Sequence, residues 1–127
     1  MPAEILLADD DQTIAKLLGD HLERQGHNVI AVYDGFELSQ QAAAHRPHLI
    51  IADIKMPGAY GSSAYQVLQR DEKTRGIPVI FISAHTRDEV AKILPKDPQT
   101  RFLHKPLDFK KLDAYVAELL PLGGFKP

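Results

Sequence analysis

The chain has 127 residues, of which 44% are apolar and 25% charged, and its formal net charge is −2. This length is typical of a single domain, and the apolar content is high enough for a core, which excludes wholesale disorder. The near balance of 15 basic and 17 acidic side chains argues against direct binding to nucleic acid or to a membrane surface through bulk charge. The absence of cysteine excludes disulfide frameworks, thiolate zinc sites and cysteine nucleophiles. Apolar runs of at most about six residues and a start without a basic leader predict a cytoplasmic protein with no membrane span.

Short apolar runs alternate along the chain with segments of helical period. In chain order we predict a strand at 5–8, a helix ending before Gly26, a strand at 29–33, a helix from Asp34 to about Arg46, a strand at 49–52, a helix burying Ala64, Val67 and Leu68, a strand at 79–82, a short helix near 87–94, a short strand at 102–103 and a helix over 108–120. The first helix follows from the spacing of Ile14, Leu17, Leu18 and Leu22, which places them on one face.

The predicted strands are unbroken apolar runs, as in strands that are covered on both faces. Five strand-then-helix units joined by short loops predict an α/β fold, with a doubly wound, five-stranded parallel sheet. We expect one domain over residues 1–120. The remaining residues, 121–127, contain Pro121 and two glycines and are expected to be a C-terminal tail or the stub of a linker.

Polar side chains follow several of the predicted strands. In an open parallel sheet, ligands bind beyond the carboxyl ends of the strands, so these side chains should meet at one edge. They are Asp9, Asp10 and Asp11 after the first strand, Asp53 after the third, Ser83 after the fourth and Lys105 after the fifth. Asp11 is well placed to cap the first helix, but capping does not account for three consecutive carboxylates, which repel one another unless a cation or solvent intervenes.

Few protein oxygens and several waters are the usual ligands of Mg²⁺, and Asp9, Asp10 and Asp53 fit that pattern, with Mn²⁺ as an alternative ion. Asp53 alone would serve equally well to cap a loop. Beside the acid pair and Lys105 it is better interpreted as a nucleophile for phosphorus. The Lys105 ammonium and the Ser83 hydroxyl would then offset charge on the oxygens of the transferring phosphoryl group.

Four motifs in order carry a family resemblance. They are Ile5–Asp11, Leu49–Gly58, Ile77–Ala84 and Phe102–Pro106. With these motifs the chain resembles, over essentially its whole length, the receiver domain of two-component response regulators, the CheY-like family. The resemblance implies a flavodoxin-like (βα)5 fold with strand order 2-1-3-4-5.

The resemblance also implies roles for individual residues. Asp53 is the implied phosphoacceptor, and Mg²⁺ would be held by Asp9, Asp10, Asp53 and the backbone carbonyl of Lys55. Ser83 occupies the position of the switch hydroxyl and Phe102 that of the rotating aromatic ring. Receivers turn the lysine inward through a cis peptide bond, so the bond between Lys105 and Pro106 is expected to be cis.

The implied function is a phosphorylation-dependent signalling switch. A sensor histidine kinase or a phosphotransfer protein would supply the phosphoryl group, and the face formed by the fourth helix, fifth strand and fifth helix would change in response. The chain would catalyse only its own phosphotransfer and dephosphorylation, and it would act on a downstream target or through an output domain that the sequence does not identify.

The sequence departs from the receiver pattern after Ser83. Pro95 and Pro98 lie where receivers have a full fourth helix, so that helix should stop near Leu94. With the fourth helix shortened and the charge near neutral, we see no self-complementary face and expect a monomer before phosphorylation.

Two side chains are predicted to affect the lifetime of the phosphoryl group. Lys55 lies two residues after the acceptor and His85 two residues after Ser83, and both should border the path of the attacking water. Shielding by them would slow hydrolysis. In the alternative they extend into solvent and have little effect.

Two other functions were weighed. A receiver-like docking module that is not phosphorylated would be expected to lack one of the acidic residues or Lys105, and none is missing. A phosphatase with an aspartate nucleophile, of the haloacid-dehalogenase type, needs a second aspartate two residues after the first. That position is Lys55, which disfavours the enzyme.

Overall fold

The computed structural model describes residues 2–56 and 59–126, with side chains described for residues 2–54 and 63–126. Its main sheet has five parallel strands in the order β2-β1-β3-β6-β7. When only the strands of this sheet are numbered in chain order, this is the order 2-1-3-4-5. These strands are β1 (Glu4–Ala8), β2 (Asn28–Val32), β3 (Leu49–Asp53), β6 (Val79–Ser83) and β7 (Thr100–His104). The predicted α/β fold and strand order are confirmed.

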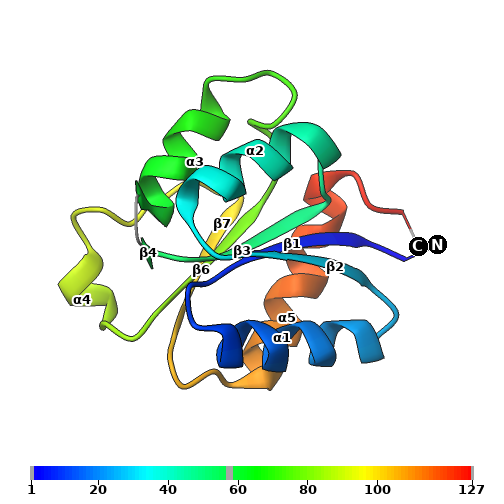
Figure 1. Cartoon of the computed structure of the whole chain (residues 1–127), viewed down its shortest axis with the longest axis horizontal. Coiled ribbons are helices and arrows are strands. Elements are labelled where there is room, and N and C mark those ends of the chain that lie inside the picture. The colour runs from blue at the N-terminus through cyan, green and yellow to red at the C-terminus, as the bar shows by residue number, and fades with distance from the viewer. Residues whose placement is uncertain (1, 57–58, 127) are drawn as a thin grey trace.

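The helices cover both faces of the sheet, with α1 and α5 on one side and α2 and α3 on the other (Figure 1). They are α1 (Gln12–Arg24), α2 (Gly35–His45), α3 (Gly61–Gln69), α4 (Arg87–Val90), α5 (Phe109–Leu119) and the 3-10 helix η1 (Leu120–Gly123). A two-stranded antiparallel hairpin, β4 (Lys55–Met56) with β5 (Ala59–Tyr60), was not predicted. No helix in the described ranges is long and apolar enough to cross a bilayer.

Alternate residues of each strand supply two separate cores. In β1, Ile5 and Leu7 pack into the core beneath α1 and α5, while Leu6 and Ala8 pack into the core beneath α2 and α3. All residues of β3 and β6 are buried, because these strands lie inside the sheet with helices on both faces. The unbroken apolar runs therefore reflect a sheet with two cores.

Local signals account for most helix ends. The Asp11 carboxylate accepts hydrogen bonds from the amides of Thr13 and Ile14, which makes it the N-cap of α1. Asp34 caps α2 in the same way. Gly26 has φ +93°, in the left-handed region that follows many helix C-termini.

Two apolar side chains predicted to be inward are exposed. Leu17 of α1 is 54% exposed and Val67 of α3 is 50% exposed. Each immediately precedes a buried leucine, Leu18 or Leu68, and one helical step rotates a side chain by about 100°. The apolar stripe of these helices is thus wider than the face that reaches the sheet.

Helix α4 is even shorter than predicted, with four residues ending at Val90. Turn-type hydrogen bonds from the amides of Ile93 and Leu94 to the carbonyl of Val90 follow it. Pro95 cannot donate a helical hydrogen bond and disfavours helical geometry at Leu94, which explains the early end. The fifth strand of the sheet, β7, is longer than the predicted 102–103.

The segment after α5 returns to the amino end of the sheet. The Phe125 ring contacts the rings of His27 and His48 edge-on, with centroids 6.4 and 5.4 Å away. Gly123 lies so close to the backbone that a Cβ atom there would be 1.9 Å from the carbonyl oxygen of His48. Within the predicted tail, Gly123 and Phe125 are therefore packed against the domain.

Candidate functional site

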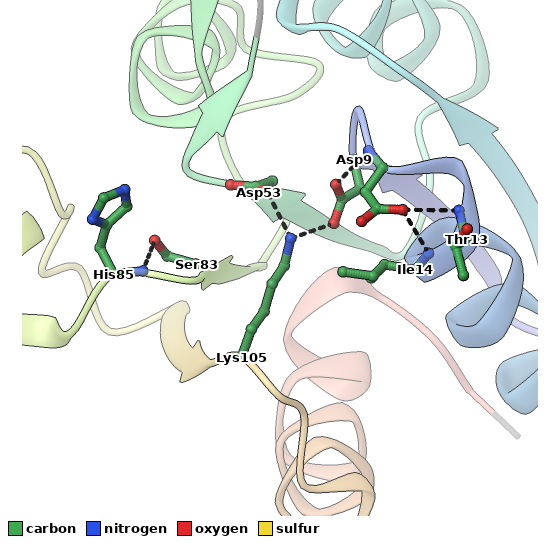
Figure 2. A network of polar contacts seen from close by, with 8 residues as sticks. Asp9, Thr13, Ile14, Asp53, Ser83, His85 and Lys105 are labelled. Atoms are coloured by element: carbon green, nitrogen blue, oxygen red, sulfur yellow. Dashed lines mark hydrogen bonds and ion pairs between the residues drawn. The ribbon is translucent and has the colours of Figure 1, made fainter.

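Side chains from four different strands converge at the carboxyl edge of the sheet (Figure 2). Asp9 follows β1, Asp53 ends β3, Ser83 ends β6 and Lys105 follows β7. The parallel strands end side by side, so residues separated by up to 96 positions in sequence come into contact. The predicted convergence at one edge is present.

Lys105 bridges two of the carboxylates. Its Nζ atom donates a hydrogen bond of 2.7 Å to Oδ2 of Asp53 and one of 2.9 Å to Oδ2 of Asp9. Burial disfavours the charged ammonium, but the hydrogen bonds and the charges of Asp53 and Asp9 outweigh it and raise the pKa of Lys105. The ammonium is therefore charged at neutral pH and held between the two acids. The bond between Lys105 and Pro106 is cis, as predicted.

Asp9, Asp10 and Asp53 form an acidic cluster in which one carboxylate oxygen of each lies within 4.8 Å of the others. Asp9 is fully buried, and this burial raises its pKa even though the amide of Asp11 and the Lys105 ammonium stabilise the carboxylate. Asp10 is exposed. Three carboxylates against one ammonium leave an excess of negative charge, which suits a divalent cation.

Lys55, the remaining predicted ligand, lies in β4, two residues beyond the end of β3. Its side chain lies outside those the structure describes. Its roles as carbonyl ligand and in phosphate lifetime stay predictions.

Ser83 is held in place by two hydrogen bonds. Its side chain is buried, and its Oγ accepts a hydrogen bond of 3.0 Å from the amide of His85. Its carbonyl accepts a bond of 2.7 Å from the amide of Lys105. A backbone hydrogen bond thus connects Ser83, which carries the hydroxyl, directly to Lys105 on the neighbouring segment.

The His85 ring lies beside Glu89, with its Nδ1 atom 3.5 Å from Oε2 of that residue. Figure 2 shows the ring on the far side of Ser83 from Asp53. The sequence predicts that this ring borders the path of the attacking water, and in the structure it is paired with Glu89. Its effect on the lifetime of a phosphoryl group stays a prediction.

Phe102 is buried, at 8% exposure, in the core beneath α2 and α3. The guanidinium of Arg87 lies over its ring, 5.5 Å from the centroid. Arg87 was not predicted from the sequence. A short helix near 87–94 was predicted, but the sequence does not show which of its side chains lies against β7.

The sequence of this chain is similar to those of known response regulators. A family model described as "Response regulator receiver domain" matches residues 5–117. The protein PilH of Pseudomonas aeruginosa is 36% identical over 112 residues, covering 87% of this chain and 91% of PilH. The regulator RpaA of Synechocystis sp., described as a DNA-binding dual master transcriptional regulator, is 33% identical over 118 residues, which cover 91% of this chain. The chain spans 48% of the length of RpaA.

Solved structures show the same fold. The receiver domain of a signal transduction histidine kinase from Syntrophus aciditrophicus has a TM-score of 0.82 at 31% identity, over 94% of this chain and 90% of that one. The receiver domain of sensor histidine kinase PA1611 from Pseudomonas aeruginosa PAO1, solved with a magnesium ion coordinated in its active-site cleft, has a TM-score of 0.87 at 24% identity, over 95% and 99% of the two chains. With a family model covering most of the sequence and the acidic edge in place, the chain belongs to the response regulator receiver domain family.

Proposed function

We propose that this receiver domain accepts a phosphoryl group on Asp53 from a phosphohistidine of a sensor histidine kinase or phosphotransfer protein. An oxygen of Asp53 attacks phosphorus, the bond from phosphorus to the histidine nitrogen breaks, and an acyl phosphate forms on Asp53. The observation that carries the proposal is the Lys105 ammonium, 2.7 Å from Oδ2 of Asp53, where it offsets charge on the transferring group.

The acidic cluster supports a need for Mg²⁺, with Mn²⁺ as a substitute. Asp9, Asp10 and Asp53 each offer a carboxylate oxygen, and the carbonyl of Lys55 is the fourth proposed protein ligand. When bound, the ion would neutralise negative charge on the phosphoryl oxygens. The magnesium ion in the PA1611 receiver, which has the same fold, supports this assignment.

Phosphorylation is proposed to act as a switch through Ser83 and Phe102. A phosphoryl group adds about two negative charges and strong acceptor oxygens at Asp53, and the Ser83 hydroxyl is the nearby donor from the next strand. Movement of Ser83 would let the ring of Phe102 rearrange on the neighbouring strand β7. The face of α4, β7 and α5 would then differ between the two states.

The output of the switch is proposed to pass to a partner protein or to a separate output domain. Relatives of both kinds occur, because the chain covers 91% of PilH but only 48% of RpaA. DNA binding, as printed for RpaA, is not proposed for this domain, whose charges nearly balance. We also propose that its chemistry is limited to its own phosphotransfer and dephosphorylation.

Intact-protein mass spectrometry after treatment with acetyl phosphate and Mg²⁺ tests the assignment. The wild-type chain should gain one phosphoryl group, and chelation of the metal should suppress the gain. Asp53→Asn should abolish it, while Asp20→Asn, which changes an exposed aspartate on α1, should leave it intact. A phosphoryl gain that survives in Asp53→Asn would refute the acceptor. No gain in the wild type would favour the docking module instead.

A further inference from the structure

A groove separates α3 from the segment that connects α4 to β7 (Figure 1). Its volume is about 630 Å³, within the range of about 300–1,000 Å³ that is usual for ligand sites. One wall comes from α3 and the residue after it, and the other from the connecting segment. The polar lining includes Gln66, Gln69, Arg70, Lys92 and Asp97. The described lining contains no carboxylate of the acidic cluster, so the groove is a separate site.

The wall formed by the connecting segment is fixed in place by side chains from its neighbours. Tyr65 of α3, which is 4% exposed, donates a hydrogen bond from its hydroxyl to Oδ2 of Asp97. The same hydroxyl accepts a bond of 3.0 Å from Nε2 of Gln99, and the Thr100 hydroxyl donates one of 2.9 Å to the carbonyl of Asp97. A wall that is already ordered loses little conformational freedom when a ligand binds.

The groove carries positive charge although the chain as a whole has a formal net charge of −2. Arg70 and Lys92 are exposed, and neither forms an ion pair with a side chain in the described ranges. Asp97 is the one acid in the described lining, and Tyr65 donates to one of its oxygens. Burial and the Asp97 carboxylate raise the pKa of Tyr65, so its hydroxyl keeps the proton that it donates. Two unpaired cations against one hydrogen-bonded acid favour an anionic ligand.

Gln69 supplies a second, independent sign of a missing acceptor. Its Nε2 atom is buried and has no hydrogen-bond partner among the described residues. A buried N–H group without an acceptor is unfavourable, so a ligand oxygen that Gln69 turns to meet in the groove would stabilise it. The lining also has an apolar part, which consists of Ile93, Leu94 and Pro95. A matching ligand therefore combines carboxylates with apolar side chains.

We propose that this groove binds a short acidic segment of a partner protein, with carboxylates at Arg70 and Lys92 and an apolar side chain against Ile93. Charge complementarity selects the acidic segment, and the apolar part of the lining selects a peptide over a free anion. Contacts to exposed cations are weak one by one, so several must combine along the segment. The proposal goes beyond the proposed function and does not depend on phosphorylation of Asp53.

The experiment is a titration of the full, 15N-labelled chain, followed by the chemical shifts of its backbone amides. The probe is a capped hexapeptide of alternating glutamate and leucine, and the shifts should concentrate at residues 66–70 and 92–97. Arg70→Gln and Lys92→Gln should each weaken binding about two- to fivefold, and together roughly tenfold. The matched control is Arg24→Gln with Lys110→Gln, which removes the same charge from α1 and α5 on the other face of the sheet and should leave binding unchanged.

A third variant reverses the expected sign. Asp97→Asn removes the negative charge from the groove but keeps a side-chain carbonyl for the Tyr65 hydroxyl, so it should tighten binding about two- to fivefold. Binding of a lysine–leucine hexapeptide with the same shifts, or equal weakening by the control variant, overturns the proposal. It is also overturned if the glutamate–leucine peptide produces no shifts at the groove. Sodium acetate or phosphate that reproduces the peptide's shifts at equal affinity would show a site for free anions and refute the peptide assignment.

Discussion

Removing the ammonium of Lys105 should destabilise the domain in a way that depends on pH and on Mg²⁺. In Lys105→Ala, the carboxylates of Asp9 and Asp53 face each other with no cation between them. Their nearest oxygens lie within 4.8 Å, and at an effective dielectric constant of about 20 two unit charges at that distance repel by about 3 kcal/mol. At about 4 °C per kcal/mol for a domain of this size, the melting temperature should fall by about 10 °C.

The sign of the pH dependence follows from Asp9. Its pKa is already raised by burial from the usual 3.8, and losing Lys105 raises it further. A folded state that holds its proton more tightly than the unfolded state loses stability as the pH rises from 3.8 through the raised pKa. The wild-type Lys105, whose pKa is raised from 10.5, keeps its charge throughout that range.

Thermal unfolding followed by circular dichroism, at about pH 4.5 and about pH 8 in chelator, measures this effect. The deficit of Lys105→Ala should be larger at the higher pH, and added Mg²⁺ should reduce it by replacing the lost cation. Lys16→Ala is the control: Lys16 is 79% exposed in its ion pair with Asp20, and removing such a pair costs about 0–1 kcal/mol. An equal deficit at both pH values, or one that Mg²⁺ does not reduce, would refute the electrostatic reasoning.

Four further predictions concern the tail, the half-buried His27, the phosphate lifetime and the oligomeric state. Gly123→Ala should lower the urea midpoint of unfolding, because the added Cβ overlaps the His48 carbonyl; an unchanged midpoint would contradict the docked tail. Burial lowers the pKa of His27 from 6.5, so the domain should lose stability as the pH falls below 6.5. In urea unfolding curves measured over a pH series, His27→Gln should remove that part of the loss. If the variant loses stability with falling pH as steeply as the wild type, His27 is not the cause. Lys55→Ala and His85→Ala should speed loss of phosphate after the phosphodonor is removed. Each tenfold change in rate corresponds to about 1.4 kcal/mol in the barrier to hydrolysis. Unchanged or slower loss in both variants would exclude shielding by these side chains. The unphosphorylated chain should sediment as a monomer at micromolar concentration, and a stable dimer there would be contrary to expectation.

The carboxyl edge of the sheet was predictable from the sequence because its parts follow strands directly. Asp9, Asp53, Ser83 and Lys105 each come at or just after the end of an apolar run, and parallel strands bring such positions together. The caps were predictable for a similar reason, since Asp11 and Asp34 act within three residues of their own position.

Contacts between segments that are distant in the sequence were not predictable where no hydrophobic periodicity marks the residues involved. The Arg87 contact depends on how α4 is oriented toward β7 and on the rotamer of an exposed arginine. The orientation of the His85 ring follows from its neighbour Glu89, one helical turn away, and not from its distance to Ser83 along the chain. The packing of Phe125 depends on the close backbone approach at Gly123, in a segment that the sequence predicts only as a tail or linker stub.

The docked tail also determines how this domain can be joined to others. The amide of His48 donates to the carbonyl of Glu4, and the ring of His48 contacts Phe125, so both ends of the described chain gather around one residue. Figure 1 shows the two ends side by side, at the end of the sheet opposite the one where β3 delivers Asp53. A neighbour attached through either end would therefore begin at the end of the sheet opposite the acidic cluster of Asp9, Asp10 and Asp53.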